Sequence, residues 1–332
     1  MKVFVTGGTG FVGKNTVKRL VESGHKCSCL VRSKSKKDEL EKIGCQFVTG
    51  DITDRESLTK GMKECEAVIN LANLYSLWEP DMSVFKTINI DGTRNVMEAS
   101  LETGIKKVVH VSSIVTWGRA PEIPFNEESP VGEHTSEYAR TKYEGDQVVW
   151  GLYRNKGLPL VMIYPCAVMG SDDPKSTGNH IKLLINKKIP IRGLESAVFT
   201  FVHVKDVAES IVRALEKDNS IGQGYIIGNE KCTIGEINKW ISEISGVPLP
   251  FISIPNFMVK LNAFFLTAVA NITKKPPAWG LSSDLVRNAL TDFRADGTKA
   301  ERELGISYTP VRQAVEECIE SFQFKKISAK NN

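Results

Sequence analysis

Tyr138 and Lys142 are the two residues of this chain whose types and spacing most directly suggest catalysis. A separation of four residues places a phenol and an ammonium group on the same face of a helix. A free tyrosine has a pKa of about 10, which makes it a poor proton donor or acceptor at neutral pH. Because a neighbouring lysine charge favours the phenolate, we expect Lys142 to lower the pKa of Tyr138. A chance pairing on a helix surface is the alternative.

Two serines, Ser112 and Ser113, follow an apolar run at 107–111 that is typical of a buried strand. Side chains alternate along a strand, so one hydroxyl is expected to face the site and the other to be structural. The carboxyl ends of parallel strands are where ligands bind in such sheets. A serine there can hydrogen-bond a substrate carbonyl and orient it towards Tyr138.

A glycine-rich turn, Thr6–Gly13, comes directly after the first apolar run. Gly7 permits a tight turn, Gly10 has no Cβ to hold a pyrophosphate away, and Gly13 lets the following helix pack close to the sheet. The amino end of that helix attracts phosphate. A second apolar run at 27–31 completes a βαβ unit, which favours dinucleotide binding over an ordinary glycine-rich turn.

Arg32 follows that second run, where a dinucleotide fold meets the adenosine ribose. An acidic residue there binds the free hydroxyls of NAD, whereas an arginine suits the 2′-phosphate of NADP. No acidic residue occurs before Asp38, and Lys36 lies close by. We therefore expect NADP as cofactor, with NAD as the alternative. If these basic residues have no function, they form a solvent-exposed turn.

Apolar β-branched runs alternate with helical patterns through the first half of the chain, which predicts an α/β fold with a doubly wound parallel sheet. After Pro165 this rhythm gives way to helices and short strand-like pieces. We expect a Rossmann domain over 1–164, a smaller and mainly helical substrate lobe over 165–324 with segments that return to the main sheet, and a frayed tail over 325–332.

The composition is that of a soluble globular protein, with 332 residues, 41% hydrophobic residues and a formal net charge of +4. Dispersed basic residues argue against nucleic-acid binding. Seven scattered cysteines favour reduced thiols and a cytoplasmic location over a disulfide framework or a metal site. Because the first strand begins at Lys2, no room is left for a signal peptide. The most apolar stretch, 257–272, is too short to span a membrane. We expect it to be buried in the lobe or to line the substrate site, with a peripheral membrane contact as the weaker alternative.

Taken together, these motifs resemble the extended short-chain dehydrogenase/reductase family, within the NAD-dependent epimerase/dehydratase superfamily. The resemblance runs from Lys2 to about Phe322 and includes Asn89–Asn95, Tyr164–Gly170 and Phe201–Val207. It implies that Tyr138 is the catalytic acid/base, that Lys142 binds the nicotinamide ribose and tunes the tyrosine, and that Ser113 polarises the carbonyl. It also implies architectural roles for Asn89, His203 and Asp206.

The family pattern places cofactor contacts at the ends of successive strands. Asp51 would border the adenine, although it could equally cap the helix that begins near Asp54. The expected cofactor-binding residues are Thr6, Gly7, Gly10, Phe11, Val12, Gly13, Arg32, Lys36, Asp51, Ile52, Leu71, Ala72, Asn73, Tyr138, Lys142, Tyr164, Pro165 and Val168.

Two departures argue against a sugar-nucleotide substrate. Tyr164 stands where many sugar-nucleotide members carry arginine, and 196–202 lacks the arginine that commonly grips a diphosphate, although Arg192 could substitute. The motifs look closer to the dihydroflavonol-4-reductase-like branch and are also similar to the hopanoid-associated sugar epimerases. We expect the substrate pocket to contain Tyr75, Trp78, Ser113 and Trp117.

The leading interpretation is therefore an NADP-dependent oxidoreductase that reduces a ketone or aldehyde of an aromatic, isoprenoid or acyl substrate, or catalyses the reverse reaction. One alternative is an NDP-sugar epimerase or dehydratase with tightly bound NAD(P). Another is an NADPH-sensing protein without catalysis. We expect a small molecule and no nucleic acid as partner, no transmembrane segment, and a homodimer as one possible assembly.

Overall fold

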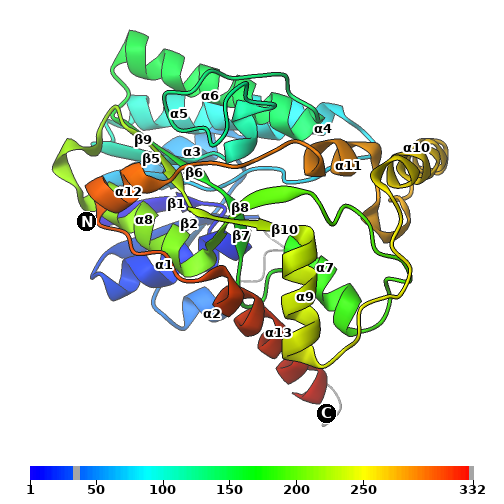
Figure 1. Cartoon of the computed structure of the whole chain (residues 1–332). Helices are drawn as coiled ribbons and strands as arrows, with labels where there is room; N and C mark the ends of the chain where they lie inside the picture. Colours follow the sequence, from blue (N-terminus) through cyan, green and yellow to red (C-terminus); the bar gives the residue numbers. More distant parts are fainter. Residues whose placement is uncertain (33–37, 329–332) are drawn as a thin grey trace.

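A seven-stranded parallel sheet forms the centre of the protein, which we describe from a computed structural model over residues 1–32 and 38–328. The strand order is β3-β2-β1-β4-β5-β6-β9, and every neighbouring pair is parallel (Figure 1). The strands are β1 (Lys2–Thr6), β2 (Lys26–Val31), β3 (Gln46–Thr49), β4 (Ala67–Asn70), β5 (Lys107–Val111), β6 (Leu160–Pro165) and β9 (Gly224–Ile227). The predicted doubly wound α/β fold is thus confirmed.

Helices cover both faces of this sheet, which explains why its strands are apolar on both sides. On one face α1 (Phe11–Glu22) packs against α8 (Val204–Glu216). On the other, α3 (Arg55–Met62), α5 (Thr93–Glu102) and α6 (Glu137–Lys156) lie side by side (Figure 1). Strand β9 comes from the second half of the chain, and α12 (Thr298–Leu304) packs against it.

A second sheet, β10-β8-β7, packs against three of the helices that follow Pro165. It consists of β7 (Ala167–Met169), β8 (Val198–His203) and β10 (Glu230–Thr233), and it shares a buried apolar cluster with α7 (Ser176–Ile185), α9 (Ile234–Ser245) and α13 (Val311–Ser328). Helix α13 continues into the segment that we expected to be frayed; 329–332 lie outside the described residues.

Helix α10 (Asn256–Thr273) lies at the outer edge of the molecule, next to α11 (Ser283–Ala289) (Figure 1). Only Val259, Ala263 and Ala270 of this helix are fully buried. The expectation that this apolar segment is buried in the lobe is therefore wrong for most of its residues. Within 1–32 and 38–328, no helix combines the length and hydropathy needed to cross a membrane.

Helix α6 lies close to the backbone at Asn89 because it carries a glycine at the point of contact. Gly145 is buried, and a Cβ added to it would lie 2.6 Å from the carbonyl oxygen of Asn89. Gly151 lies on the same helix, but nothing is within 4 Å of the position that its Cβ would occupy. These two glycines therefore form a matched pair for testing the packing of α6.

We expect Gly145→Ala to lower the free energy of unfolding by about 1–3 kcal/mol, because the added methyl group overpacks a backbone contact. Gly151→Ala should raise it by about 0.5–1 kcal/mol, because alanine favours a helix over glycine. Urea denaturation measures both changes. Equal effects of the two substitutions would contradict the close approach of α6 to Asn89.

Candidate active site

Ser113, Tyr138 and Lys142 come together at the carboxyl end of β5. Ser136 caps α6, because its hydroxyl accepts a hydrogen bond from the Ala139 N–H at 3.2 Å. The helix thus starts where its first two turns can present Tyr138 and Lys142. Ser113 follows β5 directly, is half-buried and hydrogen-bonds the Tyr138 side chain. The neighbouring Ser112 is buried, and its hydroxyl donates to Asp146, so the two serines contact different side chains of α6.

Tyr138 is buried, and burial raises the pKa of its phenol well above the ordinary value. The ring of Tyr75 contacts it edge to face, with centroids 5.1 Å apart. The hydrogen bond with Ser113 acts in the opposite direction but is the weaker effect on the pKa. Our expectation of a lowered tyrosine pKa is therefore wrong, because desolvation is the largest effect on the phenol. At neutral pH the phenol carries its proton.

Lys142 is also buried, with only 2% of its surface exposed. Its Nζ donates a hydrogen bond to the Val111 carbonyl oxygen at 3.3 Å. Burial lowers the pKa of the Lys142 ammonium, and the negative charge of Asp146 opposes that effect. Asp146 lies one helical turn further along α6 and is buried as well. The carboxylate thus compensates a charge that would otherwise be costly to bury.

Two residues lie next to the Asp146 carboxylate: His110 of β5 and Ser112, which follows this strand. The Ser112 hydroxyl donates to Asp146 Oδ2 at 2.7 Å, and His110 Nε2 lies 3.7 Å from Asp146 Oδ1. Burial lowers the pKa of the His110 imidazole, so the ring is neutral. Its Nδ1 lies 3.0 Å from Asn70 Nδ2, which can only donate. The remaining proton of the ring is therefore on Nε2, on the side of Asp146, but 3.7 Å is too long for a hydrogen bond, and Asp146 Oδ1 has no hydrogen-bond partner among the described residues.

This polar chain continues across the sheet. Asn70 Oδ1 accepts a hydrogen bond from the Thr6 hydroxyl, which itself accepts from the Ala72 N–H at 3.2 Å. Thr6, Asn70 and His110 occupy paired positions on the neighbouring strands β1, β4 and β5. We did not identify Asn70, His110 or Asp146 from the sequence. The signal was a polar residue at equivalent places in three otherwise apolar strands.

The glycine-rich turn has the shape required to bind a dinucleotide. Gly7 has a φ of +70°, and a Cβ on it would lie 2.6 Å from the backbone of Leu71. A Cβ on Gly13 would overlap the Gly7 carbonyl oxygen. No acidic residue lies in the first turn of α1, and no side chain caps it. The amino end of α1 therefore retains its positive character for a phosphate, and the turn fits a nicotinamide dinucleotide.

Most other expected cofactor residues lie near this turn, at the ends of strands β1 to β4. Arg32 follows β2 and is exposed, whereas Lys36 lies outside the described residues. Asp54 caps α3, while Asp51 Oδ1 accepts hydrogen bonds from the backbone and hydroxyl of Thr53. The capping alternative for Asp51 is thus wrong, and an adenine contact stays a prediction. The backbone of Leu71 and Ala72 is hydrogen-bonded to Thr6.

Two predictions need correction, one for the substrate pocket and one for the cofactor contacts. Trp117 is buried, stacks on Phe125 and donates from Nε1 to the Ser129 carbonyl oxygen, because the 3₁₀ helix Ile114–Trp117 turns the ring into the core. The Tyr164 hydroxyl accepts a hydrogen bond from Trp150, so its side chain packs in the core and only its backbone is available to a cofactor.

The remaining aromatic residues lie on the loop after β4. Tyr75 contacts Tyr138, as described above, whereas Trp78 Nε1 donates to Asn271 of α10 at 2.9 Å. Asn89 fixes the start of this loop to α6 through hydrogen bonds with Leu74 and Thr141. This loop is therefore connected both to Tyr138 and to α10.

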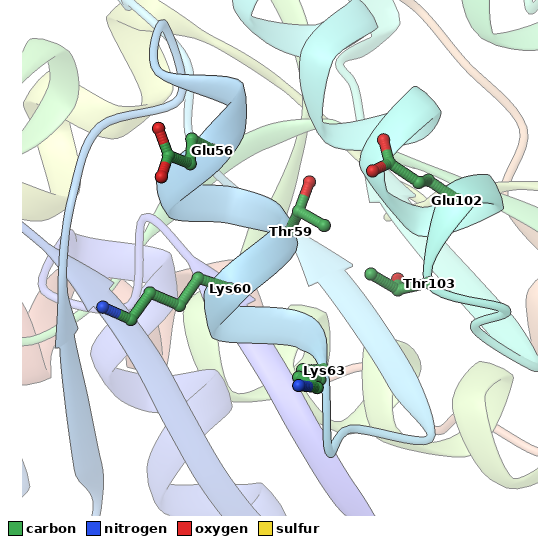
Figure 2. Close-up of a pocket in the computed structure, with 6 residues that line it drawn as sticks. All are labelled: Glu56, Thr59, Lys60, Lys63, Glu102 and Thr103. Carbon is green, nitrogen blue, oxygen red and sulfur yellow. The ribbon is translucent and has the colours of Figure 1, made fainter.

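Neither a surface groove nor a metal site adds to the candidate active site among the described residues. A groove of about 540 Å³ lies between α3 and α5, lined by Glu56, Thr59, Lys60, Lys63, Glu102 and Thr103. Figure 2 shows Lys60 pointing away from α5, and none of the predicted site residues lines the groove. Among the described residues, no three His, Cys, Asp or Glu side chains are grouped as they would be for a metal ion.

Several known proteins are similar to this chain in sequence. The model of the NAD dependent epimerase/dehydratase family matches residues 3–228. A putative dihydroflavonol 4-reductase of Synechocystis sp. is 29% identical over 96% of this chain and 94% of its own. Sterol demethylase protein B of Methylococcus capsulatus is 28% identical over 97% and 98%. A ketoreductase of Stigmatella aurantiaca, named for a farnesylated 3-oxo-dihydroquinoline-1-oxide, is 30% identical over 65% of both chains.

Solved structures show the same fold. The crystal structure of gox2253 is 30% identical and superposes with a TM-score of 0.84 over 97% of this chain and 98% of that one. UDP-glucuronic acid 4-epimerase from Bacillus cereus, in complex with UDP-glucuronic acid and NAD, is 22% identical with a TM-score of 0.80 over 97% and 99%.

The compensation of Lys142 by Asp146 can be tested without a substrate. We expect Asp146→Asn, which keeps an acceptor for Ser112, to lower the free energy of unfolding by up to about 3 kcal/mol at pH 7. The lysine pKa is depressed in the folded protein, so this penalty applies where Lys142 is protonated. The stability penalty should fade as the pH rises through the pKa of Lys142 in the folded protein, which is lower than the value of about 10.4 in the unfolded chain.

Urea denaturation of the wild type and of Asp146→Asn at pH 7 and pH 10 measures this penalty. Titrating groups that the substitution does not affect contribute equally to the two proteins and cancel. Ser112→Ala is the control, because it removes one hydrogen bond and leaves the charge; its penalty should not depend on pH. A penalty of Asp146→Asn that is the same at both pH values would contradict the electrostatic role.

Proposed function

Because the chain belongs to the NAD-dependent epimerase/dehydratase family, we propose that it is an NADP-dependent oxidoreductase that interconverts a hydrophobic ketone or aldehyde and its alcohol. The observation that carries this proposal is the buried, protonated Tyr138 between Ser113 and Tyr75 at the carboxyl end of β5. In functional terms we divide the chain into a cofactor-binding part, 1–164, and a substrate lobe, 165–324.

Each residue of the site has a role in this reaction. When bound, the dinucleotide supplies or accepts a hydride at the substrate carbon. The Ser113 hydroxyl orients the carbonyl, and the Tyr138 phenol donates its proton to the carbonyl oxygen. The Lys142 ammonium stabilises the phenolate that remains and so lowers the cost of this transfer. Asp146 acts through Lys142 and is a positioning residue.

Arg32 supports NADP rather than NAD as the preferred cofactor. It is exposed at the end of β2, where its guanidinium is available to a 2′-phosphate. The epimerase from Bacillus cereus binds NAD, so likeness of fold does not decide between the two cofactors. The arginine of this chain is therefore the feature on which the preference rests.

Several features support a hydrophobic substrate. Arg192, the candidate to grip a diphosphate, donates to Glu195 and to the Pro250 carbonyl oxygen, both at 2.8 Å. Tyr75 brings an aromatic ring against Tyr138. Among the relatives, one is named for a sterol and another for a farnesylated ketone. These observations favour an aromatic, isoprenoid or acyl substrate.

An NDP-sugar epimerase is the second candidate, favoured by the family match and by the similarity to the UDP-glucuronic acid epimerase. The two candidates differ in whether NADPH is consumed. Purified protein mixed with NADPH and a panel of aryl, isoprenoid and alkyl ketones should show a net loss of absorbance at the NADPH band. Thermal stabilisation by a UDP-sugar beyond that given by UDP would instead favour the epimerase.

Replacement of the catalytic phenol provides the first test of the mechanism. We expect Tyr138→Phe to lower the turnover of a reduced ketone by roughly 10²–10⁴-fold, because the proton donor is lost, with little change in NADPH affinity. Tyr143→Phe, on the same helix next to His134, should leave turnover unchanged. A Tyr138→Phe protein that keeps most of its activity would refute the acid/base role.

The cofactor preference has its own test. Arg32→Ala should weaken NADPH binding about ten- to a hundredfold, because a charge-assisted contact of roughly 1.5–3 kcal/mol is lost, and should leave NADH binding nearly unchanged. Lys26→Ala is the control, since it removes an exposed charge at the opposite end of β2. Isothermal titration gives both affinities. Equal losses for NADPH and NADH would show that Arg32 does not contact the 2′-phosphate.

A further inference from the structure

Helix α10 exposes a continuous apolar face. Its exposed large side chains recur three and four positions apart, so they lie along one side of the helix. They are Phe257, Met258, Leu261, Phe264, Phe265, Val269 and Ile272. The opposite side, with Val259 and Ala263, packs against α11 and its neighbours. The helix is thus anchored to the protein on one side and presents bulky apolar groups to solvent on the other.

The segments on either side of α10 extend this apolar surface. Phe251, in the loop before the helix, is 98% exposed, and Trp279, in the short 3₁₀ helix after it, is 61% exposed. Exposed apolar areas of this kind mark interaction sites in soluble proteins. We call the apolar face of α10 together with Phe251, Ile252 and Trp279 the α10 surface.

The charged residues of the segment that forms the α10 surface have one sign, while Asp81 of the loop after β4 lies near Lys274. Between Glu243 and Asp284 the sequence contains three lysines, Lys260, Lys274 and Lys275, and no acidic residue. All three lysines are exposed. Aromatic and aliphatic side chains bordered by lysines are the combination that binds the interface of an anionic bilayer, where the apolar groups enter the acyl boundary and the lysines reach the headgroups.

We propose that the α10 surface docks this protein on the surface of a membrane that contains anionic lipids. A second copy of the chain is the less favourable occupant. In a two-fold symmetric dimer the same patch meets itself, so the lysines of one copy would face those of the other without a carboxylate from this segment between them. An anionic bilayer supplies the opposite charge as well as the apolar phase.

The α10 surface is connected to the catalytic site by the loop after β4. Trp78 donates to Asn271, Lys274 Nζ donates to the Pro80 carbonyl oxygen at 3.3 Å, and the Ser282 hydroxyl donates to the Leu77 carbonyl oxygen at 2.7 Å. The same loop places Tyr75 against Tyr138. The docked enzyme would thus take its substrate from the bilayer, an inference that rests on the proposed function.

Vesicle flotation of the full-length protein tests the docking directly. The probes are large vesicles of phosphatidylcholine alone and of phosphatidylcholine with 30% phosphatidylglycerol, each at low and at high salt. We expect preferential binding to the anionic vesicles and release at high salt, because salt screens the lysines. Phe264→Ser/Phe265→Ser should weaken this binding at least about tenfold, and Lys260→Gln/Lys275→Gln about fivefold or more.

Phe324→Ser is the matched control, since Phe324 is an exposed phenylalanine on α13, far from α10 in the fold (Figure 1). Its vesicle binding should equal that of the wild type. All variants should keep the wild-type melting temperature and the wild-type turnover of a water-soluble ketone, because the substituted residues are exposed and outside the catalytic site.

Two results would overturn the proposal. One is a wild type that binds neither kind of vesicle. The other is a wild type that elutes as a dimer in light-scattering chromatography and becomes a monomer on Phe264→Ser/Phe265→Ser, without vesicle binding. Vesicle binding by a protein that reduces no ketone would uphold the docking surface and refute the proposed function, so the two failures are distinguishable.

Discussion

The burial of the Lys142 ammonium is the constraint on which the rest of the site depends. A buried charge is costly unless another charge compensates it, and here the compensating group is Asp146 on the next turn of the same helix. Asp146 must itself be held: it accepts a hydrogen bond from Ser112, and the neutral imidazole of His110 lies 3.7 Å from its other oxygen. Lys142 is thus stabilised by residues around Asp146 as well as by its own hydrogen bond to Val111.

The same requirement links catalysis to the register of the sheet. His110 is oriented by Asn70, and Asn70 by Thr6, which also binds the backbone at Ala72. These residues belong to three adjacent strands, and Thr6 begins the glycine-rich turn. A shift of one strand would therefore disturb both the dinucleotide site and the lysine. The glycine-rich turn and helix α6 are thus linked by a series of polar residues.

Much of this architecture could be predicted from the sequence, because the spacing of apolar residues and the spacing of glycines are local signals. The sheet, the turn and the grouping of Ser113 with Tyr138 and Lys142 follow from them. These local signals do not predict the direction of a side chain outside a regular strand. Trp117 turns into the core because a 3₁₀ helix follows Ser113, and α10 is exposed because only a narrow face of it packs against α11 and the apolar residues around it. The direction of the Tyr138 pKa change likewise depends on burial, which the lysine spacing does not reveal.

Transfer of a labelled hydride tests the central claim, that Tyr138 and Lys142 support net carbonyl reduction. Protein, a hydrophobic ketone and NADPH deuterated at either face of C4 are incubated, and the product is analysed by mass spectrometry. We predict that one face delivers one deuterium to the carbinol carbon, with one NADPH oxidised for each alcohol formed. A substrate whose configuration changes without net oxidation of NADPH, and without deuterium in the product, would contradict the account.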